Sequence, residues 1–156
     1  WIRQLAPAVA DLYGPGRMVI LYTLAGAVGF IFTSVAGQYI GFLPIIGGAR
    51  LSVGASAPIF GLLGALVFYG QRTGSRHVGE AGLQYALMLG LFGLIFPGVD
   101  NQAHLGGFVG GYLAGFLLDP LKPERIDHLV GAAACLAITL VAIVASIVTA
   151  LPLLVN

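Results

Sequence analysis

Long apolar segments separated by short polar stretches dominate the pattern of this chain. Five such segments stand out, covering approximately residues 18–36, 54–70, 83–96, 103–118 and 129–151. A helix needs roughly 20 residues, at about 1.5 Å per residue, to cross the hydrocarbon core of a bilayer. The first and last segments are therefore predicted to be lipid-facing spans. The middle three are shorter and rich in glycine, which favours helices enclosed by others. The pattern predicts an all-α membrane protein, a polytopic helical bundle.

The composition excludes a water-soluble globule. Hydrophobic residues make up 58% of the 156 residues and charged residues only 8%, whereas a soluble domain carries roughly 25% charged residues. The formal net charge of +1 provides no electrostatic footprint for a nucleic acid. We therefore expect the lipid bilayer to surround the chain and no nucleic acid to bind it. The single cysteine, Cys135, lies in an apolar run, which excludes a disulfide framework.

The loops between the segments predict how the chain crosses the membrane. Residues 37–53 contain Pro44 and Gly47-Gly48 but stay apolar, and they are expected to form a loop partly sunk in the interface. Six of the seven basic residues are expected on one side of the membrane, and only Arg50, in this loop, on the opposite side. The positive-inside rule makes the side with six basic residues cytoplasmic, so the second and fourth segments both begin on the non-cytoplasmic side. That cytoplasmic side carries Arg3, Arg17, Arg72, Arg76, Lys122 and Arg125.

A hydroxyl opens the second segment, in the stretch Gly54-Ala55-Ser56-Ala57-Pro58. Polar groups inside a bilayer are expensive and usually mark function. A helix start offers free backbone N–H groups to a developing oxyanion, and proline suits the first turn because its missing N–H is not needed there. These features favour Ser56 as a nucleophile. A structural alternative stays open, because a serine among glycine and alanine also helps membrane helices to pack.

An imidazole opens the fourth segment. On a helix His104, Gly107 and Gly111 fall on one face at spacings of three and four residues, and Ser56 and Phe60 form a comparable face on the second segment. Paired glycines at this spacing let two helices approach closely, as a Ser–His hydrogen bond of about 2.6–3.2 Å requires. Serine and histidine together are the minimum equipment for nucleophilic attack on a carbonyl. The alternative is that His104 is an ordinary interfacial side chain.

A third catalytic member is not evident, because the spans contain no Asp or Glu. Asp100 and Asn101 precede the fourth segment and are interpreted as caps of the helix that begins near Ala103. We therefore favour a Ser–His dyad over a triad. Phe60 would pack against the imidazole of His104 and hold its orientation, a role compatible with ordinary core packing. Three scattered histidines exclude an H-E-x-x-H metal site, and we expect neither a metal nor a cofactor.

Two groups of residues closely resemble the signature helices of the rhomboid intramembrane serine proteases. The resemblance implies a compact helical bundle in which a serine and a histidine form a dyad, within a water-filled cavity that opens outward. It also implies cleavage of single-span membrane proteins near the outer end of their transmembrane segments, without cofactor or metal. The matching residues are Gly54-Ala55-Ser56 with Phe60-Gly61-Leu62-Leu63-Gly64-Ala65, and Asp100-Asn101 with Ala103-His104-Leu105-Gly106-Gly107-Phe108 and Gly111.

Two departures from the family pattern qualify these expectations. The family usually has glycine directly after the serine, where this chain has Ala57; because alanine is small, we expect activity to survive. The family's second helix normally contributes a histidine and an asparagine to the oxyanion hole, and nothing before residue 18 supplies that pair. Because the chain begins with Trp1 rather than Met, we expect a piece that lacks the first helix and most of the second. The backbone N–H of Ser56 is then the oxyanion donor that remains, and the chain by itself can be inactive.

The resemblance also suggests how the chain is organised. Residues 1–17 are expected to hold the end of a preceding helix and a cytoplasmic loop, and residues 18–118 the catalytic core helices. Residues 119–128 form a cytoplasmic connector, and residues 129–156 an additional C-terminal transmembrane helix.

Three functions compete for this sequence. The leading hypothesis is an intramembrane serine protease that acts on transmembrane proteins. The second is a rhomboid-like pseudoenzyme that binds membrane clients without cleaving them, although such relatives typically lack the serine or the histidine. The third, a transporter or channel subunit, would need a polar pore lining that the spans do not provide. The sequence makes no prediction of oligomeric state.

Overall fold

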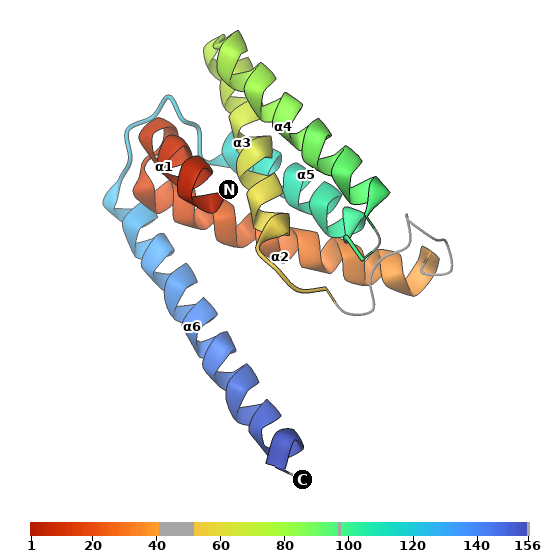
Figure 1. Ribbon diagram of the computed structural model, residues 1–156. Coiled ribbons are helices and arrows are strands. Elements are labelled where there is room, and N and C mark those ends of the chain that lie inside the picture. The colour runs from red at the N-terminus through yellow and green to blue at the C-terminus, as the bar shows by residue number, and fades with distance from the viewer. Residues whose placement is uncertain (41–51, 97, 156) are drawn as a thin grey trace.

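The computed structural model describes residues 1–40, 52–96 and 98–155, and these residues form six helices and no strand (Figure 1). The prediction of an all-α helical bundle is confirmed. The helices are α1 (Ile2–Tyr13), α2 (Pro15–Ile40), α3 (Ser56–Thr73), α4 (Arg76–Ile95), α5 (Asn101–Leu117) and α6 (Ile126–Val155).

Helices α2, α3 and α5 pack against one another and form the centre of the bundle. Their backbones approach closely because glycines line the contacts. A Cβ atom added at Gly107 or Gly111 of α5 would collide with the carbonyl oxygen of Ala57 or Gly61 of α3. A Cβ atom at Gly29 of α2 would lie 2.7 Å from the carbonyl oxygen of Ala103 of α5. The two chain segments that open with Ser56 and His104 therefore lie backbone to backbone.

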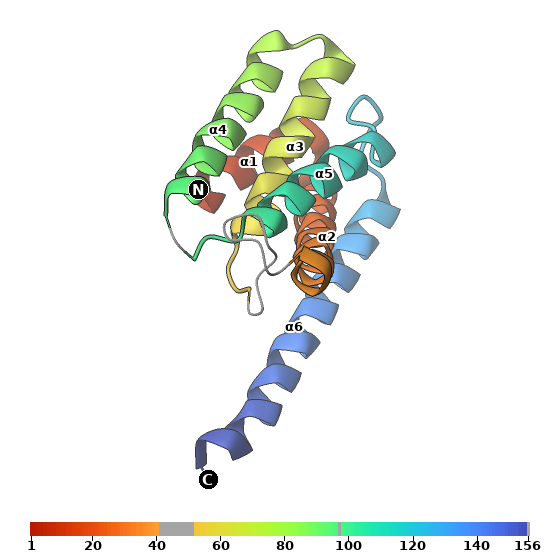
Figure 2. The same ribbon diagram turned by 90° about the vertical axis from the view of Figure 1, so that its right-hand side faces the viewer.

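The remaining helices cover this centre from outside. Helix α1 packs on α2 and α3, where the hydroxyl of the buried Tyr13 donates a 2.8 Å hydrogen bond to the carbonyl of Ala65. Helix α4 lies along α3. Helix α6 contacts only α2 among the described helices, and it projects beyond the rest of the bundle in both views (Figures 1 and 2).

Three helices are long and apolar enough to cross a membrane, over Pro15–Tyr39, Arg76–Ile95 and Ile126–Ala150. The expectation that all three middle segments are enclosed holds for α3, but it is wrong for α4 and for one face of α5, where Leu113 and Phe116 are 54% and 64% exposed. Only small residues of α4, such as Gly82 and Ala86, are buried, while Leu91 and Ile95 are 60% and 73% exposed. Glycine on the α3 side allows close packing there, and the large apolar side chains point outward as in a lipid-facing span.

The helix boundaries differ from the expected segments at several points, and the largest difference is at α4, which begins at Arg76 and not near residue 83. Helix α2 continues to Ile40, so the predicted interfacial loop begins later than residue 37, and residues 41–51 of that loop lie outside the described residues. Between α1 and α2 only Gly14 is non-helical, which is shorter than the loop expected within residues 1–17. Gly14 has a φ of 97°, which glycine adopts without steric cost, and Pro15 is suited to the first position of the next helix.

A buried arginine ties the start of α2 to the connector between α5 and α6. Arg17 is 1% exposed. Its guanidinium donates hydrogen bonds to Nδ1 of His128 at 3.1 Å and to the backbone carbonyls of Asp119 and Lys122 at 3.2 and 2.8 Å, and also to the carbonyl of Pro123. The cation is thus compensated by backbone carbonyls of the connector and by the imidazole of His128 at the start of α6.

The same end of the bundle holds an ion pair between Arg72, in the last turn of α3, and Asp119 at 3.3 Å. Burial raises the pKa of Asp119, but hydrogen bonds from the Leu121 backbone and Arg72, with the charge of Lys122, outweigh it and hold the pKa below its ordinary value of 3.8. Basic residues from α2, α3 and the connector between α5 and α6 therefore lie at this end. Ser56 and His104 lie at the opposite ends of α3 and α5.

Candidate active site

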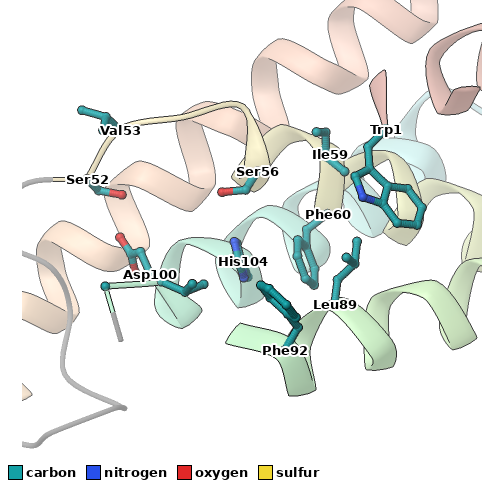
Figure 3. Close-up of a pocket in the computed structure, with 12 residues that line it drawn as sticks. Trp1, Ser52, Val53, Ser56, Ile59, Phe60, Leu89, Phe92, Asp100 and His104 are labelled. Carbon is teal, nitrogen blue, oxygen red and sulfur yellow. The ribbon is translucent and has the colours of Figure 1, made fainter. Parts of the chain in front are cut away.

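The two residues proposed for chemistry line a single cavity. Ser56 is the first residue of α3 and His104 lies in the first turn of α5, and both face a cavity of about 380 Å³ (Figure 3). One wall is apolar and comes from Trp1, α3 and α4, and the other carries Asp100 and Ser52. The full lining comprises Trp1, Ser52, Val53, Ser56, Ile59, Phe60, Leu89, Phe92, Gly98, Val99, Asp100 and His104.

The local sequence explains why Ser56 stands at a helix start. Gly54 has a φ of 125°, a conformation that side chains other than glycine rarely adopt, and no atom lies within 4 Å of the position that its Cβ would take. The glycine is therefore required by the turn and not by packing. The first intrahelical bond at this end runs from the N–H of Ile59 to the carbonyl of Ala55 at 3.1 Å. The N–H groups of Ser56 and Ala57 precede it and have no acceptor within the helix.

The methyl group of Ala57, which replaces the glycine usual in the family, does not face the cavity. Ala57 is 1% exposed and is not among the lining residues. Its Cβ lies toward Gly29 of α2, where an added Cβ would come within 2.9 Å of it. The methyl group thus fills a contact between α2 and α3.

His104 is held by its helix cap and by an aromatic ring. Asp100 is the N-cap of α5, and its Oδ1 accepts a 2.9 Å hydrogen bond from the N–H of Ala103, as the sequence indicated. The imidazole stacks on Phe60 with ring centroids 4.1 Å apart and planes 12° apart. His104 and Phe60 are only 7% and 6% exposed. The stacking fixes the plane of the imidazole, and Nδ1 of His104 has no hydrogen bond to a carboxylate.

Two buried polar atoms of the site, on His104 and Asp100, have no hydrogen-bond partner. Figure 3 shows a ring nitrogen of His104 on the side of the ring nearest Ser56, but no hydrogen bond joins the two side chains among the described residues. Nδ1 of His104 and Oδ2 of Asp100 are both buried without a hydrogen-bond partner, so Asp100 does not act as a bonded third member. Catalytic hydrogen bonds are often long in unliganded sites and tighten when substrate is bound.

Sequence reasoning did not identify several residues of the site. Trp1, Leu89 and Phe92 form much of the apolar wall, and nothing in the hydrophobic pattern distinguishes them from lipid-facing residues. Thr33 of α2 is 1% exposed and donates a 2.8 Å hydrogen bond to Oδ1 of Asp100. Its polarity inside an apolar segment was a usable signal, since buried polar groups in spans tend to be functional. Among the described residues, no group of three His, Cys, Asp or Glu side chains is placed to hold a metal ion.

Comparisons with known proteins find similarity to rhomboid proteins. A family profile described as "Rhomboid domain" matches residues 1–121. Rhomboid protease GluP of Bacillus subtilis (strain 168) is 32% identical over 114 residues, which are 71% of this chain and 20% of that protein. RHOMBOID-like protein 7 of Arabidopsis thaliana is 46% identical over 110 residues, 68% of this chain and 32% of that protein.

Rhomboid-like protease 5 of Toxoplasma gondii is 33% identical over 122 residues, 74% of this chain and 13% of that protein. The chain thus matches between 13% and 32% of the length of these three relatives. No solved structure matches the chain.

Proposed function

The chain belongs to the rhomboid family, and on that premise we propose that it is the catalytic part of an intramembrane serine protease that uses Ser56 and His104 as a dyad. The observation that carries the proposal is the shared cavity. A hydroxyl and an imidazole, from the starts of two helices that touch backbone to backbone, line the same 380 Å³ space. Relatives whose names describe them as proteases support a proteolytic function.

The reaction begins when Oγ of Ser56 attacks the carbonyl carbon of a substrate peptide bond and its proton passes to His104. The carbonyl oxygen becomes an oxyanion, to which the N–H groups at the start of α3 donate hydrogen bonds. The C–N bond then breaks, and the leaving amine takes the proton from His104. Water attacks the remaining ester with His104 as base, which releases the carboxylic acid and returns the proton to Ser56. Stacking on Phe60 keeps the imidazole in register through both steps.

The substrate class follows from the apolar wall of the cavity. Trp1, Leu89 and Phe92 suit an unfolded apolar segment, and Ser56 lies at the end of a buried helix and not at its middle. We therefore propose transmembrane proteins as substrates, cut near one end of their spans. The basic residues gathered at the other end of the bundle support a non-cytoplasmic position for this end.

A pseudoenzyme that binds membrane clients without cutting them is the second candidate. The observation in its favour is that no hydrogen bond joins Ser56 to His104 among the described residues. Relatives named only as rhomboid-like are compatible with it. It predicts that a client copurifies uncut with the wild-type protein, and that replacing Ser56 changes nothing.

The test is cleavage of a single-span model substrate by the full-length protein in liposomes. Ser56→Ala and His104→Ala should each reduce the rate by several orders of magnitude, as loss of such partners usually does, with an unchanged elution profile. Ser34→Ala and His77→Ala are matched controls, because Ser34 bonds only the backbone of its own helix and His77 is outside the cavity. Substantial cleavage by the Ser56→Ala protein would overturn the assignment.

A further inference from the structure

A threonine on α2 reaches the cap of the helix that carries His104. Hydroxyl groups on the described helices mostly bond the carbonyl four residues earlier, as Ser34 does to Phe30 and Thr23 does to Val19. Thr33 is different, because its hydroxyl donates across to Oδ1 of Asp100, at the start of α5. It is also one of the few fully buried polar side chains of the described residues.

The acceptor of this bond is the atom that begins α5. Oδ1 of Asp100 accepts both from Thr33, at 2.8 Å, and from the N–H of Ala103, at 2.9 Å. The backbone carbonyl of Asp100 accepts the N–H of His104 at 3.2 Å. The position of Asp100 therefore sets where the first turn of α5 starts and how it is rotated, and His104 is in that turn.

Packing reinforces the same contact. One turn before Thr33, Gly29 lies against α5, so close that a Cβ atom there would be 2.7 Å from the Ala103 carbonyl and 3.2 Å from the Gly107 N–H. Gly29 and Thr33 lie on the same face of α2, so the hydrogen bond of Thr33 is next to the close contact at Gly29. The contact leaves little freedom for α5 to slide along α2.

We propose that Thr33 is a positioning residue, which acts through Asp100 to fix the first turn of α5 and so the direction of the His104 imidazole toward Ser56. The inference rests on the proposed function, since it matters only if the dyad reacts. Thr33 does not line the cavity and does not touch the reacting atoms. A displacement of about 1 Å at reacting groups can reduce a rate on the order of a hundredfold, so a small rotation of the turn has a measurable effect.

The experiment is the kinetics of labelling by a fluorophosphonate serine probe in the full-length protein. The amplitude of labelling counts correctly folded sites, and the rate constant reports how well each site is aligned. Thr33→Val keeps the shape of the side chain and removes the hydroxyl, and should lower the rate constant by about tenfold or more at full amplitude. Thr33→Ser should restore most of the rate, and Ser34→Ala should leave it unchanged.

A double-mutant cycle tests whether the effect passes through Asp100. In the Asp100→Ala background, Thr33→Val should have little further effect on the rate constant, because the carboxylate that accepts the Thr33 hydrogen bond is already absent. Asp100→Asn retains an acceptor oxygen and should keep the response to Thr33→Val.

An unchanged rate constant for Thr33→Val would overturn the inference while labelling of the wild type still supports the dyad. A loss of amplitude alone would also overturn it, because it shows a purely structural role. Absence of labelling in the wild type would instead contradict the proposed function.

Discussion

A valine at Gly107 should separate the two helices that carry the proposed dyad. Gly107 lies one turn after His104, and a Cβ atom added to it would collide with the carbonyl oxygen of Ala57, with the Cα atom of Ala57 at 3.2 Å. Both are backbone atoms of the residue next to Ser56, so no side-chain rotation relieves the overlap. The helices themselves must move apart.

The size of the effect follows from that movement. Overpacking a tight contact destabilises a protein by typically 1–3 kcal/mol, which leaves a folded protein in most cases. Relieving the collision requires a shift on the order of 1 Å, and a shift of about 1 Å can reduce the rate on the order of a hundredfold. We therefore expect Gly107→Val to reduce turnover of folded protein by about a hundredfold.

Two other glycines are matched controls for the same substitution. At Gly110 an added Cβ would meet side-chain atoms of Val28 on α2 at 2.8–3.3 Å, and that side chain, 40% exposed, has room to move. At Gly90 of α4 no atom lies within 4 Å. Replacing glycine by valine changes the intrinsic helix propensity by the same small, favourable amount at all three sites, so differences among the variants report the contacts.

The assay is turnover of a single-span substrate, normalised to the amount of correctly folded protein. Activity should fall in the order Gly90→Val, Gly110→Val, Gly107→Val, with the first close to wild type. Equal activity of the Gly107 and Gly110 variants would refute the reasoning, because the contact with α3 would then not govern the geometry of the site.

Three further predictions concern other contacts. Phe60→Leu removes the stacking on His104, which for aromatic pairs is worth about 0.5–1.5 kcal/mol, and should reduce kcat by up to about tenfold. Phe60→Tyr should retain the stacking and the wild-type kcat. Equal kcat values for the two variants would count against an orienting role of Phe60. In Arg17→Lys, the lysine side chain cannot reach all the acceptors of the guanidinium. Because a hydrogen bond to a charged group is worth roughly 1.5–3 kcal/mol, the thermal midpoint of the variant in detergent should be lower by several degrees. An unchanged thermal midpoint would contradict this prediction. The pKa of Asp119 is lowered in the folded state. The contribution of its carboxylate to stability is therefore complete above pH 3.8 and is lost as the pH falls through the lower folded-state pKa. Thermal midpoints of Asp119→Asn and wild type should therefore differ near neutral pH and converge in acid, and a gap that persists at low pH would exclude the ion pair with Arg72 as its cause.

Local signals in the sequence predicted the two ends of helices on which the site is built. Pro58 and Asp100 each act within a few residues, so a first helical turn and a cap could be inferred without knowledge of the fold, whereas the turn at Gly54 became evident only in the structure. The glycine spacing of Gly107 and Gly111 likewise indicated a close helix contact, which exists against α3.

What the sequence did not reveal depends on contacts between distant segments. The exposure of α4 was missed because its glycines were interpreted as a sign of enclosure, although only Gly79 and Gly82 lie in the close contact with α3. Thr33 was missed because its partner, Asp100, is 67 positions away. The hydrogen bonds of Arg17 to the connector were missed for the same reason, because their acceptors are about a hundred positions away and Arg17 by itself resembles an ordinary basic residue of a loop.

Locating the serine that reacts with a fluorophosphonate probe tests the central claim most directly. The full-length protein would be labelled in membranes, digested and analysed by mass spectrometry, with His104→Ala treated in parallel. Modification of Ser56, at one serine only and greatly slowed by His104→Ala, is the result that the account predicts. Modification of another serine such as Ser52, or labelling of Ser56 that does not depend on His104, would contradict a dyad of Ser56 and His104.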